Sequence, residues 1–373
     1  MVVSLLSIAA VLAFLAVTHL VNRFREQEKA LARHLYAQGQ SDLDSGKPEA
    51  AIGYFRAALG YNRSDFEYQL SLARALRDTG RTRESKSYLM NLWERSPEDG
   101  PVNLALGRLA VRENSTGEAI HYYHNAEYGV WNADTQLHRR NAQFELVEFL
   151  LQQNAHPAAD AELITLAASL PPDPELRSRA AQMFFRAGDY EHALSEYQSA
   201  LQHDRLNAIA QAGAGEAAFQ LRRYTTAEKY LDAALKTDPQ NESAAKSLQT
   251  AKLVMQIDPF IRRISIAERN HRIQSAFDRA GERLAACTSS REPDQPVPAN
   301  QSSSSDISEL QQEWIAIKPK ISRHHGIAES DSAEQVMDLV FQIEQKTEGI
   351  CGEPSDLDHA LLLLAQDRDG VDQ

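Results

Sequence analysis

Residues 173–207 read DPELRSRAAQMFFRAGDYEHALSEYQSALQHDRLN, and residues 208–241 read AIAQAGAGEAAFQLRRYTTAEKYLDAALKTDPQN. The second stretch repeats the landmarks of the first after 34 residues: Tyr190 and Tyr224, Ala193 and Ala227, Tyr197 and Leu231, Ala200 and Ala234, Leu201 and Leu235, Asp204 and Asp238. A fixed period of about 20 to 50 residues is typical of stacked structural repeats. The pattern predicts a pair of helices in each period.

The first third of the chain carries the same period, and three more repeats begin near Ala32, Phe66 and Gly100. Small residues recur at the eighth place of each repeat (Gly39, Ala73, Gly107) and at the twentieth (Ala51, Ser85, Ala119). Small side chains let two helices approach closely, and the glycines Gly46 and Gly80 between them favour a left-handed turn.

Residues 134–172 are interpreted as a degenerate repeat with a lengthened first helix at 137–153. About six repeats result, and a capping helix at 242–256 completes a solenoid over residues 32–257. Glycine (17) and proline (14) are sparse, so helix is favoured along most of the chain and the predicted fold class is all-α.

Over residues 32–255 these landmarks resemble the tetratricopeptide-repeat (TPR) family, in the form of a bacterial-type protein with an N-terminal membrane anchor. The tryptophan that the family carries at the fourth place is missing throughout, and the residues there are Leu35, Gln69, Asn103, Arg177 and Gln211. Families built from similar helix pairs therefore remain an alternative. The resemblance implies a helix-turn-helix solenoid that binds other proteins or peptide segments in its concave groove.

The N-terminus carries a hydrophobic run from Val2 to Val21. About 20 apolar residues suffice to cross a bilayer, so we expect residues 1–22 to form a transmembrane anchor. A cleavable signal peptide is the alternative, but no basic residue precedes the run. The expected location is therefore a membrane, in single-pass form, and the inner membrane if the protein is bacterial.

The side of the membrane is indicated by two conflicting signals. The basic residues Arg23, Arg25, Lys29 and Arg33 follow the run and favour the cytoplasm. Cys287 and Cys351, the two cysteines of the chain, could form a disulfide that requires an oxidising compartment. We place the soluble part outside the cytoplasm.

Residues 258–373 form a separate C-terminal helical region with a flexible linker at 288–306, where serine and proline are frequent. Helices are predicted at 260–286, 307–317, 332–345 and 357–366.

Charge and motifs limit the function. The net charge of -13 argues against nucleic acid, because phosphate binding requires a clustered basic surface. No phosphate-binding glycine loop, nucleophile elbow, zinc-binding His-Glu-x-x-His or dinucleotide fingerprint is found. We therefore expect no enzyme activity, no cofactor and no metal.

The family's groove positions, transferred place by place, predict a partner-binding surface at Arg33, Tyr36, Gln40, Arg74, Arg77, Arg108, Arg112, Gln182, Phe185 and Phe219. Its front part is rich in arginine, which would suit acidic or carboxylate-ended segments. Two alternatives remain: the arginines could form local helix pairs, and Phe185 and Phe219 could pack between repeats. In the family's carboxylate clamp, Lys and Asn occupy the places at which this chain has Tyr36 and Gln40. The ligands of that clamp are therefore not expected here.

The resulting prediction is a membrane-anchored scaffold for protein–protein interaction. The alternative is a regulatory or enzymatic role in the C-terminal helical region, with the repeats as a docking arm.

Overall fold

The structure is a computed structural model, and it describes residues 2–289, 302–321, 330–348, 351 and 353–369. In those residues it contains 17 α-helices and one isolated backbone bridge, between Asp99 and Val130. The predicted all-α fold class is therefore confirmed.

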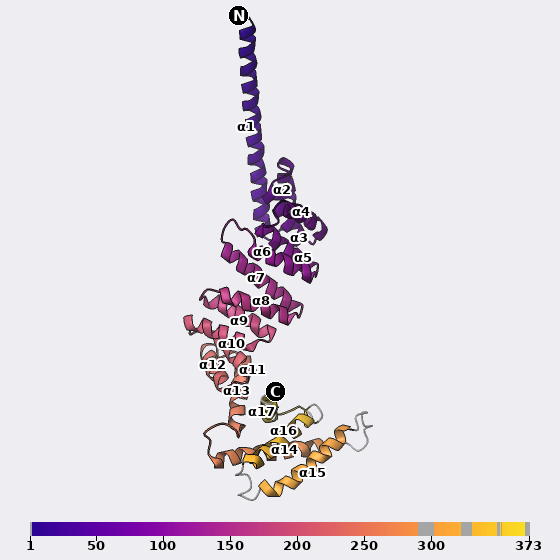
Figure 1. Cartoon of the computed structure of the whole chain (residues 1–373), viewed down its shortest axis with the longest axis vertical. Helices are drawn as coiled ribbons and strands as arrows, with labels where there is room; N and C mark the ends of the chain where they lie inside the picture. The colour runs from indigo at the N-terminus through magenta and orange to yellow at the C-terminus, as the bar shows by residue number, and fades with distance from the viewer. Residues whose placement is uncertain (1, 290–301, 322–329, 349–350, 352, 370–373) are drawn as a thin grey trace. The chain divides into compact units, whose positions relative to one another are not determined.

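The chain divides into two compact units, Met1–Ala168 (unit 1) and Ser169–Gln373 (unit 2), and Figure 1 labels their helices. Unit 1 contains α1 (Val2–Asp44), α2 (Pro48–Tyr61), α3 (Phe66–Asp78), α4 (Thr82–Arg95), α5 (Gly100–Arg112), α6 (Thr116–Tyr128), α7 (Thr135–Gln152) and α8 (His156–Ser169), which ends at the boundary. Unit 2 contains α9 (Pro174–Ala187), α10 (Tyr190–His203), α11 (Ala208–Gln220), α12 (Tyr224–Thr237), α13 (Glu242–Ile257), α14 (Ile266–Ser289), α15 (Ser302–Ile321), α16 (Ser330–Thr347) and α17 (Asp356–Asp369).

The turns between paired helices repeat one backbone conformation. A residue with positive φ occupies each of six such turns: Gly46 (71°), Gly80 (78°), Asn114 (53°), Asn154 (56°), Gly188 (89°) and Arg222 (58°). Successive positions differ by 34, except for a step of 40 between Asn114 and Asn154. The extra residues lie in the predicted degenerate repeat, whose first helix α7 has 18 residues, against 13 in α3, α5 and α11.

Close packing within each pair depends on the small residues at the eighth place. A side chain at Gly39 would overlap the ring of Phe55, and one at Gly215 would overlap Leu231. The first helices also begin alike, because Asp65, Asp99, Asp173, Asn207 and Asn241 each accept a hydrogen bond from a backbone N–H of the first turn. Sequence spacing, turn and cap therefore agree on one repeating unit.

A test of this packing is the substitution Ala193→Leu on α10, where the alanine is fully buried. We expect a loss of about 1 to 3 kcal/mol of unfolding free energy, because a larger side chain must displace the facing helix. Ala245→Leu is the matched control, since Ala245 is exposed on α13. Equal thermal melting curves for the two variants would contradict the repeat frame.

The N-terminal helix α1 passes the predicted boundary at residue 22 without interruption. Crossing a bilayer takes about 20 consecutive apolar residues. In the part of the chain that the structure describes, no helix is long and apolar enough for this. The prediction of a membrane span at residues 1–22, and with it of a single-pass membrane protein, is therefore wrong.

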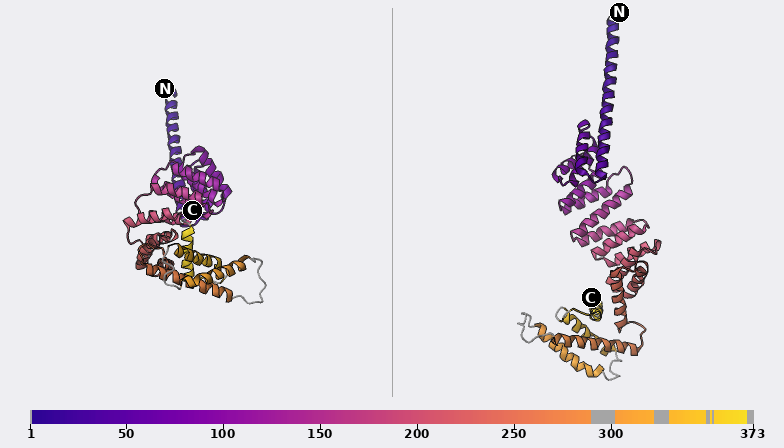
Figure 2. Two further views of the ribbon diagram at one scale, coloured as in Figure 1. Left: turned by 60° about the horizontal axis from the view of Figure 1, so that its bottom comes forward. Right: turned by 180° about the vertical axis from the view of Figure 1, so that it is seen from behind.

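The C-terminal helices α14 to α17 pack with α13 around one apolar core in unit 2, and Figure 2 shows them in orange to yellow from two further sides. Large members of this core are Val254, Ile273, Phe277, Leu284, Met337, Val340, Leu361 and Leu364. Trp314 of α15 lies flat on Phe277 of α14, with ring centroids 5.1 Å apart.

Three boundaries in this region differ from prediction. Helix α14 begins at Ile266 instead of 260, because Asp258 accepts the N–H of Phe260 and Ser265 accepts that of Glu268. Helix α15 contains Pro319, at which the predicted helix was expected to end. The predicted linker at 288–306 is helical at both ends, up to Ser289 and from Ser302, and residues 290–301 lie outside the described part.

Candidate functional site

Three of the arginines predicted to line the groove, Arg74 and Arg77 of α3 and Arg108 of α5, lie near one another in unit 1. Arg74 and Arg108 lie 34 residues apart and hold equivalent places on the two helices. The charges of Arg108 and Arg77 both act on Arg74 and lower its pKa, so the three guanidinium groups lie close to one another. These three arginines therefore form a cluster of positive charge on α3 and α5.

Arg74 is the least compensated of these side chains. It is half-buried, and this burial is the main reason why its pKa is lowered, ahead of repulsion from Arg108 and Arg77. Glu67 acts in the opposite direction but is not hydrogen-bonded to it. In the described residues Arg74 makes no ion pair, so its donors are available to an incoming anion.

Arg77 and Arg112 share one carboxylate, Asp78. Arg77 donates from Nε to Asp78 Oδ1 at 2.9 Å, and its Nη2 lies 2.8 Å from the same oxygen. Arg112 reaches that oxygen only at 4.0 Å. The Nη1 of Arg77 is buried and has no hydrogen-bond partner in the described part of the chain, which leaves a costly unsatisfied donor beside Arg74.

Arg108, by contrast, already forms an ion pair within unit 1. Its Nε and Nη2 donate to the two carboxylate oxygens of Glu145 on α7, at 2.7 and 2.6 Å. Tyr123 of α6 donates to the same carboxylate at 3.2 Å. The hydrogen bonds that Arg108 donates to Glu145 raise the pKa of Arg108, and burial raises that of Tyr123. This bidentate pair ties α5 to α7, and it joins two helices where the alternative had expected pairs within one helix.

Tyr36 and Gln40 of α1 form a small polar cluster with Ser71 of α3. Gln40 Nε2 donates to Tyr36 Oη and to Ser71 Oγ, both at 2.7 Å. Tyr36 also stacks on Tyr68, with ring centroids 4.8 Å apart. Both predicted residues therefore hold α1 against α3, one turn of helix away from Arg74.

Arg33 is exposed on α1 and lies apart from these contacts. It lines a cleft of about 440 Å³ whose other lining residues are Arg25, Glu28, Lys29, Ala32, Tyr61, Asn62, Asp65 and Tyr68.

Of the three predicted groove residues of unit 2, one is exposed and two pack against neighbouring aromatic rings. Gln182 is exposed, whereas Phe185 packs edge-on against Tyr190 with ring centroids 5.1 Å apart. Phe219 packs edge-on against Tyr224 at 5.8 Å and contributes to the C-terminal core. These aromatic side chains make packing contacts between helices.

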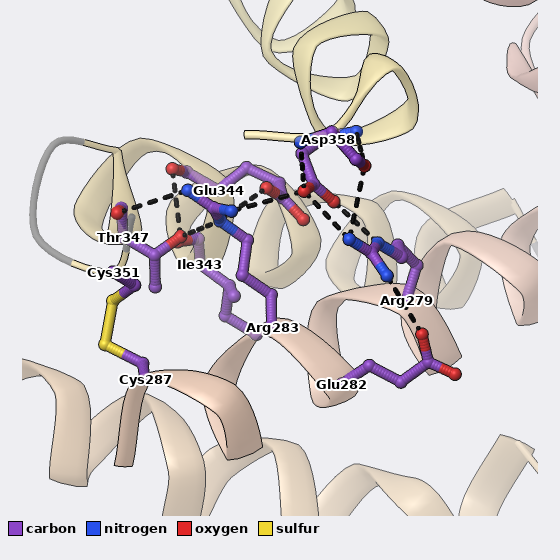
Figure 3. A network of polar contacts seen from close by, with 10 residues as sticks. Arg279, Glu282, Arg283, Cys287, Ile343, Glu344, Thr347, Cys351 and Asp358 are labelled. Atoms are coloured by element: carbon purple, nitrogen blue, oxygen red, sulfur yellow. Dashed lines mark hydrogen bonds and ion pairs between the residues drawn. A yellow bond between two sulfur atoms is a disulfide. The ribbon is translucent and has the colours of Figure 1, made fainter. Parts of the chain in front are cut away.

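A second charged cluster, which the sequence interpretation missed, lies among α14, α16 and α17 (Figure 3). Arg279 donates to both oxygens of Asp358, from Nε at 2.7 Å and from Nη2 at 2.9 Å. Arg283 donates to Asp358 Oδ2 at 3.2 Å and to Thr347 Oγ1 at 2.8 Å, and lies 3.4 Å from Glu344. Burial raises the pKa of Asp358, but its hydrogen bonds with Arg279 and Ser355 outweigh this effect, so the pKa is lowered.

Glu344 is the unsatisfied member of this cluster. Its side chain is fully buried, and neither oxygen accepts a hydrogen bond in the described part of the molecule. Burial, and then the charge of Asp358, raise its pKa to about 7. Because Glu344, Asp358 and Arg283 are all shielded from solvent, the cluster is built to hold helices together and offers no open surface to a substrate. No grouping of His, Cys, Asp and Glu that could hold a metal occurs in the described residues.

Comparison with models of known protein families identifies the type of repeat. Residues 36–98 and 184–252 match models of the tetratricopeptide repeat, so the chain contains tetratricopeptide repeats. Comparison with curated protein sequences gives no match.

Several solved structures resemble the chain at low sequence identity. YrrB, described as a TPR protein with an unusual peptide-binding site, is 18% identical and has a TM-score of 0.41, with 52% of this chain and 97% of that one covered. PilW, a type IV pilus biogenesis factor, is 16% identical with a TM-score of 0.42, over 60% and 98% of the two chains. The pilF protein of Pseudomonas aeruginosa is 16% identical with a TM-score of 0.41, over 61% and 98%.

Proposed function

We propose that the protein is a scaffold that binds segments of other proteins, and that it catalyses no reaction itself. Tetratricopeptide repeats are helix pairs whose stacking creates an extended concave surface, a surface that repeat proteins use for binding. The observation that carries the proposal is the uncompensated positive charge of Arg74 on α3, the first helix of its repeat.

The partner segment is acidic in this proposal. A guanidinium that is half-buried without a counter-ion gains most from a carboxylate, because the hydrogen bonds so formed are charge-assisted and water is already partly excluded. Arg108 and Arg112 play a lesser part, since Glu145 and Asp78 already occupy them. Arg77 is also held by Asp78, so the anchor for an incoming carboxylate is Arg74, with the charge of Arg77 beside it.

The test is the double substitution Arg74→Gln and Arg77→Gln, with a labelled oligoglutamate peptide as the probe. We expect fluorescence anisotropy to report binding that is about tenfold weaker or more, because the charge-assisted contact of Arg74 and the neighbouring positive charge of Arg77 are lost while helicity is kept. Wild-type binding should also weaken as salt is added.

The matched control is Arg63→Gln with Arg83→Gln, which removes the same charge from exposed positions elsewhere in unit 1. Equal losses in both double variants would mean that only net charge matters. Unchanged binding in the Arg74 and Arg77 variant would refute the anchor.

A further inference from the structure

Two ties join the C-terminal ends of α14 and α16 in parallel. Arg283 donates to the side chain and the backbone oxygen of Thr347, the last residue of α16, at 2.8 and 3.3 Å. Cys287 lies four residues after Arg283, and Cys351 lies four residues after Thr347. The two cysteines are joined by a disulfide. Cys351 N–H donates to Thr347 O at 3.1 Å, so the cysteine continues the same turn of chain. A polar and a covalent tie therefore hold one junction (Figure 3).

The first turn of α17 is fastened to the same junction. Asp358 accepts hydrogen bonds from Arg279 and Arg283 and also from the N–H of Ser355, whose hydroxyl accepts the N–H of Asp358 in return. This reciprocal arrangement is a capping box, which starts the helix where the arginines hold it. The position of α17 therefore depends on the ends of α14 and α16.

Helix α17 in turn covers α13, the last helix after the repeats of unit 2. Leu361 and Leu364 of α17 belong to the same core as Ala251 and Val254 of α13, and both α13 residues are buried. At the edge, Gln249 donates to Asp356 at 3.3 Å. The last helix of a solenoid has an apolar face that no further repeat covers, and here α17 covers it.

Polar ties of this kind stabilise little by themselves. Burying charged groups costs free energy that their mutual attraction only partly returns, and Glu344 adds a buried carboxylate without hydrogen bonds. The disulfide contributes differently, because it closes a loop across a sequence separation of 64 and so restricts the unfolded chain. The junction therefore relies on the covalent tie.

We propose that the Cys287–Cys351 disulfide is a redox latch that keeps α17 on α13. A dithiol reductant would open it. One thiolate of the reductant attacks Sγ of Cys351, the more exposed sulfur, and Cys287 leaves as a thiolate. The second thiolate of the reductant then displaces Cys351, so two electrons and two protons pass to the cysteines and the reductant becomes a disulfide. Helix α17 leaves α13, whereas α14 to α16 keep their apolar contacts.

The test compares amide hydrogen exchange of the full chain in the oxidised form and after reduction by dithiothreitol. We expect the amides of α17 to exchange roughly 30-fold faster or more after reduction, while those of α14 and α16 change little. The variant Cys287→Ser with Cys351→Ser should behave like the reduced protein in both buffers. Helices α3 and α5 of unit 1, which contain no cysteine, serve as internal references.

Each other outcome overturns the proposal. Unchanged exchange in α17 would mean that the polar ties hold the helix alone. Equal acceleration in α14, α16 and α17 would mean that the disulfide stabilises the whole helical region and releases no single helix. Because wild-type protein is folded before reduction, these two readings hold even if the double serine variant fails to fold. None of them depends on whether the front groove binds acidic segments.

Discussion

Replacing Glu344 with Gln should stabilise the C-terminal helices by up to roughly 3 kcal/mol at pH 8 and by little near pH 4.5. The pKa of this buried carboxyl is about 7 in the folded protein, against 4.5 for an unperturbed glutamate. The folded state therefore binds the proton more tightly, and its free energy of unfolding falls as pH rises from about 4.5 to 7. Glutamine keeps the shape of protonated glutamate and has no charge to bury.

The groups that face Glu344 come from two other helices. Arg283 and Arg279 of α14 favour its charged form, and Asp358 of α17 opposes it. The effect of burial on the pKa of Glu344 exceeds that of the two arginines, so the pKa is raised. Removing the charge is therefore expected to stabilise the protein. Hydrogen exchange of α14 and α16 amides between pH 5 and 8 would measure the effect, with Glu348→Gln as the exposed control in the turn directly after α16. A wild-type protein whose stability does not decline over this range would contradict it.

The repeat architecture could be predicted because each element is local. The left-handed turn at Gly46, Gly80 and Gly188 follows from glycine itself, and the 34-residue period extends it to Asn114 and Arg222. The small residues at the eighth place and the capping residues recur with the same period. The helix pairs could therefore be predicted without knowledge of distant contacts. The longer step before Asn154 was visible only as a degenerate repeat.

The arginine cluster of α3 and α5 could be predicted only in part. The period places Arg74 and Arg108 at equivalent positions, but it does not tell which of them finds a partner. Arg108 pairs with Glu145 of the lengthened helix α7. Because α7 departs from the 34-residue period, the repeat pattern does not predict which of its residues faces Arg108. Arg74 lacks such a neighbour in the described residues, and this difference, invisible in the sequence, distinguishes the proposed anchor.

The C-terminal cluster could not be predicted for a different reason. Arg279 and Asp358 are 79 residues apart, and the region between them has no period that would fix how its helices pair. Ser355 caps the last helix, and its partner in the capping box is Asp358, three residues further along the chain. The two cysteines were the only signal that α14 and the chain after α16 meet.

Asp358 is the single carboxylate on which both arginines of this cluster converge. It is fully buried, and each of its oxygens accepts at least one hydrogen bond from a guanidinium. Its pKa is lowered, so its contribution to stability is present above the unperturbed value of 3.8 and is lost as pH falls below it. At neutral pH the full contribution is therefore in place.

The substitution Asp358→Asn should destabilise unit 2 by about 3 to 5 kcal/mol at pH 7, because removing one partner leaves buried positive charge without compensation. Arg283 is 5% exposed, so water cannot replace the lost carboxylate there. Asp356→Asn, two residues earlier and exposed, should change stability by less than about 0.5 kcal/mol. Thermal unfolding followed by circular dichroism, with hydrogen exchange to assign the transition to unit 2, measures both variants. If the Asp358 variant melts like the Asp356 control, the arginines are already satisfied by Ser355, Thr347 and Glu344, and the cluster does not hold α17.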